Sequence, residues 1–188
     1  MLKPGCPRRR RADGITLIEV LVSVVILSFG LLGLANLQSK MHVAEVEAYQ
    51  RAQAVLALAD MSERISANRT QAASYVSVGL IGAGDSQPTS CAGIAAGPAH
   101  DLCEWSNTLK GGAEGASNAF GARGCITQVQ PPGVAGACKP GIYEVTVTWQ
   151  GMVRSTTPSL ACAAGAYGTN DDYRRAVSAR VAIGVPSC

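Results

Sequence analysis

The sequence predicts an α+β protein in which one long N-terminal helix, membrane-spanning in its first half, packs on a small antiparallel β-sheet. The domain that holds the sheet is predicted to be loop-rich and disulfide-bonded. Three observations support this fold class. Helical periodicity runs to residue 68, with no proline between Pro7 and Pro88. Two segments near the C-terminus alternate apolar and polar residues, as half-buried strands do. Six cysteines lie beyond residue 90.

The chain begins with a basic segment that is followed directly by an apolar one. Lys3 and the run Arg8 to Arg11 precede Gly14, and Val20–Leu37 contains no ionisable residue. Positive residues beside a membrane helix stay in the cytoplasm, so the N-terminus is predicted inside and the rest of the chain outside. Residues 15–37 would form about 34 Å of helix, which is enough to cross a bilayer core. A core helix in a soluble protein is the alternative, and the adjacent arginines disfavour it.

Glu19 is a carboxylate at the start of this apolar run, where a charge costs roughly 2.5–3.5 kcal/mol on insertion scales. A secretory signal has its cleavage site after the apolar run, whereas the suitable small residue here, Gly14, comes before it. Cleavage after Gly14 would remove the basic leader and leave the apolar helix on the mature protein. Glu19 would then lie four residues from a new amine at Ile15. A charged residue in such a position usually has a specific role, and no catalytic pattern accompanies Glu19.

One helix is predicted over 15–68, and its part beyond the apolar run is amphipathic. Glu47 with Arg51, and Asp60 with Arg64, have the i,i+4 spacing of ion pairs on the polar face. The face expected to pack on the domain consists of small and apolar residues at helical spacing. These residues are Met41, Ala44, Ala48, Ala52, Val55, Ala59 and Ile65.

Residues 79–140 are rich in Gly, Ala, Pro, Ser and Asn and are predicted to form loops, with a short helical turn around Trp105. Tyr143–Trp149 alternates strictly and places its odd-numbered residues on one face; Val177–Ile183 does the same. These two segments are predicted to pair as antiparallel strands laid on the helix. Ile126–Gln130 is a weaker third strand. Trp105 and Trp149 are interpreted as core anchors.

Cys6 belongs to the leader, so cleavage leaves six of the seven cysteines. An even number in the exported part predicts disulfides formed in an oxidising compartment. Six cysteines allow fifteen pairings, and the sequence cannot choose between them. A sequential pairing is the working prediction: Cys91–Cys103, Cys125–Cys138 and Cys162–Cys188. A zinc site is disfavoured because the chain has no Cys-x-x-Cys pair and only two histidines, so no metal is expected.

The net charge of +3 comes from the leader. Residues 1–14 hold five of the 16 basic and one of the 13 acidic side chains, which leaves 11 basic and 12 acidic residues. A nucleic-acid-binding domain needs a basic face, so no specific nucleic-acid partner is expected. His42 and His100 have no nucleophile pattern nearby, and no Gly-x-Ser-x-Gly elbow occurs. We therefore expect neither catalysis nor a cofactor.

The basic leader, the Gly14–Glu19 stretch and the apolar run together resemble the class III signal of type IV pilins and of the related type II secretion pseudopilins. The resemblance implies that a prepilin peptidase cuts between Gly14 and Ile15, and that Ile15 is then N-methylated. It also implies that Glu19 is the glutamate found in this family, which sets axial register with a neighbouring subunit. The first mature residue here is isoleucine, where the family usually has phenylalanine.

Further segments are similar to one group of minor pilins, the type IV pilus modification proteins (pilin V). They are Ile18-Glu-Val-Leu-Val, Gly30-Leu-Leu-Gly-Leu, Tyr49-Gln-Arg-Ala-Gln and Asp60–Arg69. The resemblance implies a pilin fold and a structural protein that helps to start type IV pilus assembly, with roles in twitching motility and adhesion. The implied partners are other minor pilins, the major pilin, the prepilin peptidase/methyltransferase and the inner-membrane assembly platform. The implied location is the inner membrane, with a periplasmic C-terminal domain, and then the fibre.

The expected division of the chain is a cleaved leader at 1–14, a transmembrane and assembly segment at 15–37, an amphipathic helical segment at 38–69 and a β-rich exported domain at 70–188. A minor pseudopilin of a type II secretion system is the alternative function, because it shares the signal and the helix. A membrane-tethered binding module that never polymerises is a third possibility, and it predicts an uncleaved leader.

Overall fold

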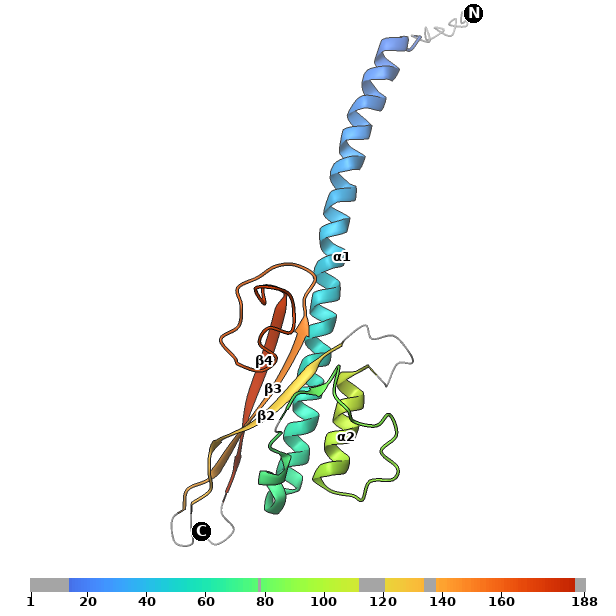
Figure 1. The fold of residues 1–188 in the computed structure, drawn as a ribbon. Coiled ribbons are helices and arrows are strands. Elements are labelled where there is room, and N and C mark those ends of the chain that lie inside the picture. The colour runs from blue at the N-terminus through green and yellow to red at the C-terminus, as the bar shows by residue number, and fades with distance from the viewer. Residues whose placement is uncertain (1–13, 78, 112–120, 134–137, 185–188) are drawn as a thin grey trace, which may run out of the picture. The chain divides into compact units, whose positions relative to one another are not determined.

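The computed structural model describes residues 14–77, 79–111, 121–133 and 138–184 (Figure 1). The predicted leader, up to residue 13, and Cys188 lie outside the described residues. The chain divides into two compact units, Met1–Val43 and Ala44–Cys188. The elements in chain order are α1 (Leu17–Ala67), η1 (Arg69–Tyr75), β1 (Ile81–Gly82), α2 (Pro98–Leu109), β2 (Arg123–Gln130), β3 (Gly141–Gln150) and β4 (Arg174–Ile183).

Helix α1 confirms the single long helix that the sequence predicts. It spans Leu17–Ala67, against a predicted range of 15–68, and is 51 residues long. Its ordinary helix formers and the lack of proline allow it to continue without interruption. Among the described residues it is the one helix long and apolar enough to cross a membrane.

The sheet has the strand order β1-β2-β3-β4, and each neighbouring pair is antiparallel. The β3–β4 register runs unbroken from Gly141 opposite Ile183 to Gln150 opposite Arg174, which confirms the predicted hairpin-like pair. The predicted third strand is the end of the longer β2, which carries an irregularity between Gln128 and Gln130. Strand β1, only two residues long, was not predicted.

One face of the sheet forms the core with the C-terminal part of α1 and with α2. The odd-numbered residues Tyr143 to Trp149 of β3 are all buried, as predicted. Trp105 of α2 is fully buried, and its indole Nε1 donates a hydrogen bond to Ala57 O at 2.9 Å. Gly124 of β2 allows this close approach, because a Cβ there would lie 2.1 Å from Cη2 of Trp105.

The prediction of which α1 face packs on the domain is wrong. The buried residues are Ala54, Ala57, Leu58, Met61 and Ile65. Of the predicted set only Ile65 is among them, and Ala48, Ala52, Val55 and Ala59 are exposed. Both faces carry small or apolar residues at helical spacing, so periodicity alone does not distinguish them. The domain covers the face with Leu58, Met61 and Ile65, whose larger side chains bury more apolar area.

Helix α2 is a second correction, because the sequence predicted loops with only a helical turn in this region. It extends over 12 residues, with Pro98 in its first turn and Asp101 near its N-terminus, both favourable there. Gly97 precedes it at a φ of 138°, which an L-residue with a side chain rarely adopts. The surrounding Gly and Pro residues, read as loop signals, are therefore the start signals of this helix.

The disulfides partly follow the predicted pairing. Cys91 is bonded to Cys103, as predicted. Cys125 is bonded to Cys162, so the predicted Cys125–Cys138 and Cys162–Cys188 bonds are wrong. Cys138 is also disulfide-bonded. The Cys125–Cys162 bond joins β2 to the β3–β4 loop across a separation of 37 residues, a tertiary contact that local spacing does not reveal.

The β3–β4 loop, residues 151–173, is held against the outer face of the sheet. Arg174 is buried and donates to Asp171 Oδ2 at 2.9 Å and to the carbonyl of Cys162 at 3.0 Å. Tyr167 is buried as well; its hydroxyl donates to the carbonyl of Thr148 at 3.1 Å, and Arg123 lies over its ring. These contacts explain why Thr148, on the outer face of β3, is also buried.

Candidate functional site

The N-terminal junction of the described chain is exposed. Gly14 and Ile15 precede the first helical residue, Leu17, and the side chain of Ile15 is 75% exposed. A Cβ added at Gly14 would meet nothing within 4 Å. The amides of Glu19 and Val20 donate to the carbonyl of Thr16, which closes the first turn. Gly14 and Ile15 therefore lie in an exposed, non-helical backbone segment just before α1.

Glu19 lies in the first turn of α1 and is exposed. A carboxylate in a first turn interacts favourably with the partial positive charge of the helix N-terminus. The backbone carbonyl of Glu19 accepts a hydrogen bond from Ser23 Oγ at 2.7 Å. This hydrogen bond uses the main-chain carbonyl of Glu19 and not its carboxylate.

The part of α1 within the first unit exposes its apolar side chains on every side. Leu17, Ile18, Ile26, Phe29, Leu31 and Leu32 are all strongly exposed, and none of the most apolar 18-residue window is buried. A helix that is apolar all round needs an apolar environment, such as a bilayer or a bundle of similar helices. The apolar helix therefore fits membrane anchoring.

Residues 9–35 match the family model of the prokaryotic N-terminal methylation motif. This motif is the signature of type IV pilins and prepilins. It covers the predicted cleavage junction, Glu19 and most of the apolar run. Together with an α+β fold in which a long helix packs on a small antiparallel sheet, this motif supports a protein similar to type IV pilins or pseudopilins. Neither the curated proteins nor the solved structures contain a match to this chain.

A polar network joins the end of α1 to α2 in the second unit. We call it the Arg64 network; it consists of Asp60, Arg64, Asn68, Tyr75, Asp101 and Glu104. Arg64 binds Asp60 at 3.0 Å, which confirms that predicted i,i+4 pair, and also Asp101 at 3.0 Å and Glu104 at 2.6 Å. Asp60 and Arg64 lie on one face of α1, and Asn68, just past its end, continues that face because its amide donates to Arg64 O at 3.0 Å.

Tyr75 is the buried member of this network. Its buried hydroxyl donates to Asp101 Oδ2 and accepts a hydrogen bond from Asn68 Nδ2 at 2.7 Å. Burial and the hydrogen bond to the Asp101 carboxylate raise the pKa of Tyr75 to about 12. The Asp60–Arg69 segment thus has a structural role, because it anchors α2 to the end of α1.

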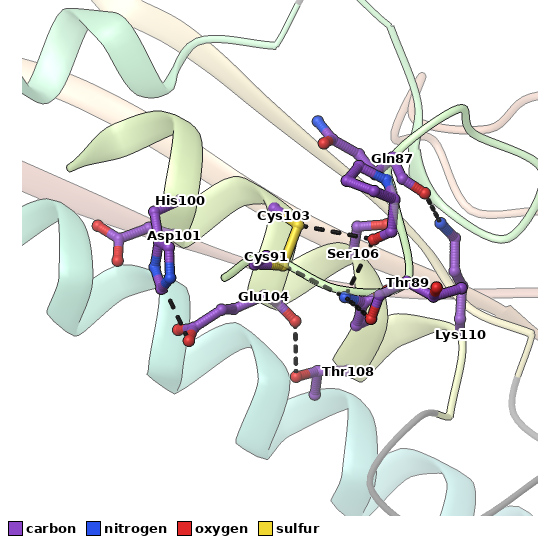
Figure 2. Close-up of a disulfide and its surroundings, with 12 residues drawn as sticks. Gln87, Thr89, Cys91, His100, Asp101, Cys103, Glu104, Ser106, Thr108 and Lys110 are labelled. Atoms are coloured by element: carbon purple, nitrogen blue, oxygen red, sulfur yellow. Dashed lines mark hydrogen bonds and ion pairs between the residues drawn. A yellow bond between two sulfur atoms is a disulfide. The ribbon is translucent and has the colours of Figure 1, made fainter. Parts of the chain in front are cut away.

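His100, Asp101 and Glu104 are the described acidic and histidine side chains that come close enough to hold a metal ion, with ligand atoms within 4.8 Å of one another. Figure 2 shows His100 directed toward Glu104, at 3.8 Å. The two carboxylates already bind the Arg64 guanidinium, a cation that balances their charge. We therefore interpret this cluster as part of the Arg64 network.

Asp85 organises the loop that precedes α2. Its carboxylate accepts hydrogen bonds from Gly82 N at 2.7 Å and Ser106 Oγ at 2.7 Å, and it binds Lys110 at 2.5 Å. Burial alone would raise the pKa of Asp85, but the Lys110 ammonium and these hydrogen bonds lower it below its ordinary range. The Cys91–Cys103 disulfide fastens the same loop to α2 (Figure 2).

Glu47 also differs from its predicted role. It binds Arg175 of β4 at 3.0 Å, in place of the predicted partner Arg51. Its Oε1 also accepts hydrogen bonds from the amides of Met152 and Val153, at 3.1 and 3.2 Å. Local i,i+4 spacing favoured Arg51, but two backbone donors and a guanidinium from the sheet form a better-satisfied site.

Proposed function

We propose that the protein is a minor pilin that helps to initiate and takes part in the assembly of a type IV pilus. The observation that carries the proposal is the methylation motif at the exposed start of an apolar helix. The Gly14–Ile15 bond is accessible before α1 begins, so a peptidase can cut it without unfolding the helix. Cleavage there removes the basic leader and leaves the apolar helix as the N-terminus of the mature chain.

Before assembly, the mature chain crosses the inner membrane once through the apolar part of α1. The basic leader keeps the N-terminus in the cytoplasm, and the disulfide-bonded domain is exported to the oxidising periplasm. The prepilin peptidase and methyltransferase act at Gly14 and Ile15, and the assembly platform then moves the subunit into a fibre with other minor pilins and the major pilin. In the fibre, neighbouring apolar helices replace the lipid.

Glu19 sets the axial register in this proposal. Its carboxylate pairs with the methylated N-terminal amine of an adjacent subunit, which is the nearest positive group that an apolar helix bundle provides. At about 4 Å and an effective dielectric of 20, the gross attraction is about 4 kcal/mol. A buried pair of this kind specifies register more dependably than it adds net stability, because both charges lose hydration.

The face of α1 that points away from the sheet also supports the proposal. Ala48, Ala52, Val55, Leu56 and Ala59 are exposed on that face, and we call them the outward stripe. Small residues allow helix backbones to approach closely. The stripe fits the α1 helix of a neighbouring pilin, whose small and apolar residues would cover it.

The N-terminal sequence and intact mass of the membrane-extracted protein test this proposal. A chain that starts at methylated Ile15 is expected. A chain that retains residues 1–14 would contradict assembly into a fibre and favour a tethered module.

A deletion strain separates the pilus from the type II secretion system. Loss of surface pili and twitching, with unchanged exoprotein secretion, is expected for a minor pilin. Loss of exoprotein secretion with normal pili would assign the chain to the pseudopilins, which share the methylation signal.

A further inference from the structure

We propose that the free edge of β4, Arg174–Ile183, binds an extended, acidic segment of another exported protein by strand addition. Strand β4 is the last strand of the sheet, next to β3 alone (Figure 1). An edge strand presents unpaired backbone N–H and C=O groups, which can pair with an added strand. The two edges of this sheet differ in how they are protected.

The opposite edge is closed. Strand β1 pairs Ile81 and Gly82 with the start of β2. Further along β2, the amide of Ser77 donates to Ile126 O and the Ile126 amide donates to Ser77 Oγ, both at 3.0 Å. The irregularity at Gln128–Gln130 then interrupts the strand. Three features protect this edge from further pairing: a short strand, a hydrogen bond from a side chain and an irregularity in the strand.

In the part of the chain that the structure describes, the β4 edge has none of these protective features. Its ten residues pair with β3 in unbroken register, and they include no proline, glycine or lysine. Among the described residues, no hydrogen bond beyond the β3 pairing reaches the backbone of 176–183. The edge is thus long, regular and open, which is unusual unless a partner covers it.

The side chains of β4 indicate what the added strand must carry on its inner face. Val181 is 8% exposed, whereas Val177, Ala179 and Ile183 are only half-buried against the core. An added strand with apolar residues at alternate positions would cover these side chains and extend the core.

The charges on β4 indicate which residues the added strand must carry on the side that faces away from the core. Strand β4 has three arginines and no acidic residue. Arg174 is buried against Asp171 and Arg175 binds Glu47, so Arg180 is the arginine that an added strand would meet. Arg180 remains 66% exposed although its Nε lies 3.2 Å from Glu144 Oε1. A second copy of β4 would bring further arginines and no carboxylate, so the charges disfavour self-pairing. Glutamate or aspartate opposite Arg180 would complement the edge.

The test uses the full chain in detergent with its disulfides intact, and a short fluorescent peptide that alternates valine with glutamate. Binding is followed by fluorescence anisotropy. Two isomers of the peptide carry N-methyl groups on one or the other alternate set of backbone amides. An added strand uses only one set to pair with β4, so one isomer is expected to bind at least about tenfold more weakly than the other.

Arg180→Glu is expected to weaken binding of the unmethylated peptide about fivefold, because an attractive cross-strand pair becomes repulsive. Arg69→Glu makes the same charge change at an exposed residue of η1 and is expected to leave binding unchanged. Absence of peptide binding would overturn the proposal. Equal binding of both isomers would also overturn it, since that indicates charge attraction alone. Dimerisation of the chain that competes with the peptide would identify a second copy as the occupant and contradict the acidic partner.

Discussion

Glu19 has a proposed role that depends on a partner from another subunit. It is exposed in the first turn of α1, and the first-turn position favours a carboxylate there. In a filament, however, an unpaired carboxylate among apolar helices would be costly. Its proposed partner is the amine that cleavage creates on another subunit, so its role exists only in the assembly.

Glu19→Ala is expected to reduce incorporation into pili at least about tenfold, because the register contact with the neighbouring amine is lost. Leader cleavage and membrane insertion should be unchanged, since Ala is more apolar than Glu. Immunoblots of sheared pili and of membranes measure both. Ser23→Ala, on the same helix, is the control. Wild-type incorporation of the Glu19→Ala chain would contradict a role in register.

The environment of Asp85 predicts that the stability of the domain that holds the sheet depends on pH. Its lowered pKa means that the ionised form is favoured by folding, so this stabilisation is complete above the unfolded pKa of about 3.9. It is lost as the pH falls through the lower folded pKa, because both states are then protonated. The free energy of unfolding of wild type minus that of Asp85→Asn should shrink below about pH 4. Urea unfolding at pH 7 and pH 3 measures the difference. A constant difference across this range would show that the carboxylate charge does not stabilise the domain.

At the scale of elements, the domain that holds the sheet is stabilised by polar contacts and disulfides at the borders of its hydrophobic core. The Arg64 network fastens α2 to α1, and the Cys91–Cys103 bond fastens the preceding loop to α2. On the other side of the sheet, Arg174 and the Cys125–Cys162 bond secure the β3–β4 loop. Charged groups and disulfides thus order segments whose small residues bury little apolar area.

The two described disulfides are expected to contribute different amounts to the free energy of unfolding. By loop-closure entropy, removal of Cys125–Cys162 costs about 4 kcal/mol and removal of Cys91–Cys103 about 3 kcal/mol. Their separations are 37 and 12 residues. The Cys125→Ser/Cys162→Ser chain should also be cut more rapidly by protease within residues 151–173, whereas the Cys91→Ser/Cys103→Ser chain should not. Urea unfolding and mapping of the cleavage sites measure these effects. Equal protection of the loop in both variants would contradict a clamp at Cys162.

At the scale of the whole molecule, the proposed assembly depends on surfaces that the single chain does not cover. The apolar part of α1 and the outward stripe are exposed in the two units. Large exposed apolar surfaces in a folded chain mark contacts with a membrane or with other proteins. The matched test compares two valines of nearly equal exposure, Val55 in the stripe at 46% and Val129 on β2 at 47%.

Val55→Glu is expected to abolish incorporation into pili, because it buries an unpaired carboxylate between helices. Val129→Glu should retain incorporation, and both chains should unfold within about 0.5 kcal/mol of wild type, as exposed substitutions usually do. Thermal unfolding and immunoblots of sheared pili measure the two properties. Equal incorporation of both variants would show that another surface makes the subunit contact.

The sequence by itself determined the features that depend on local order along the chain. Local properties, namely hydropathy, period and charge, predicted the apolar helix α1 and the strands within 143–149 and 177–183. The Asp60–Arg64 pair and the Cys91–Cys103 bond were predicted because their partners are close in sequence. The same rule failed for Cys125, so closeness in sequence suggests a pairing without deciding it.

Only the tertiary structure decided which of several equivalent local patterns is used. It turned Leu58, Met61 and Ile65 inward and the predicted alanine face outward, because the larger side chains bury more area. It paired Glu47 with Arg175 and Cys125 with Cys162, across separations that no local spacing encodes. It also left β4 as an open edge at the opposite end of the sheet from the closed β1–β2 edge. This difference arises only when the strands are ordered in space.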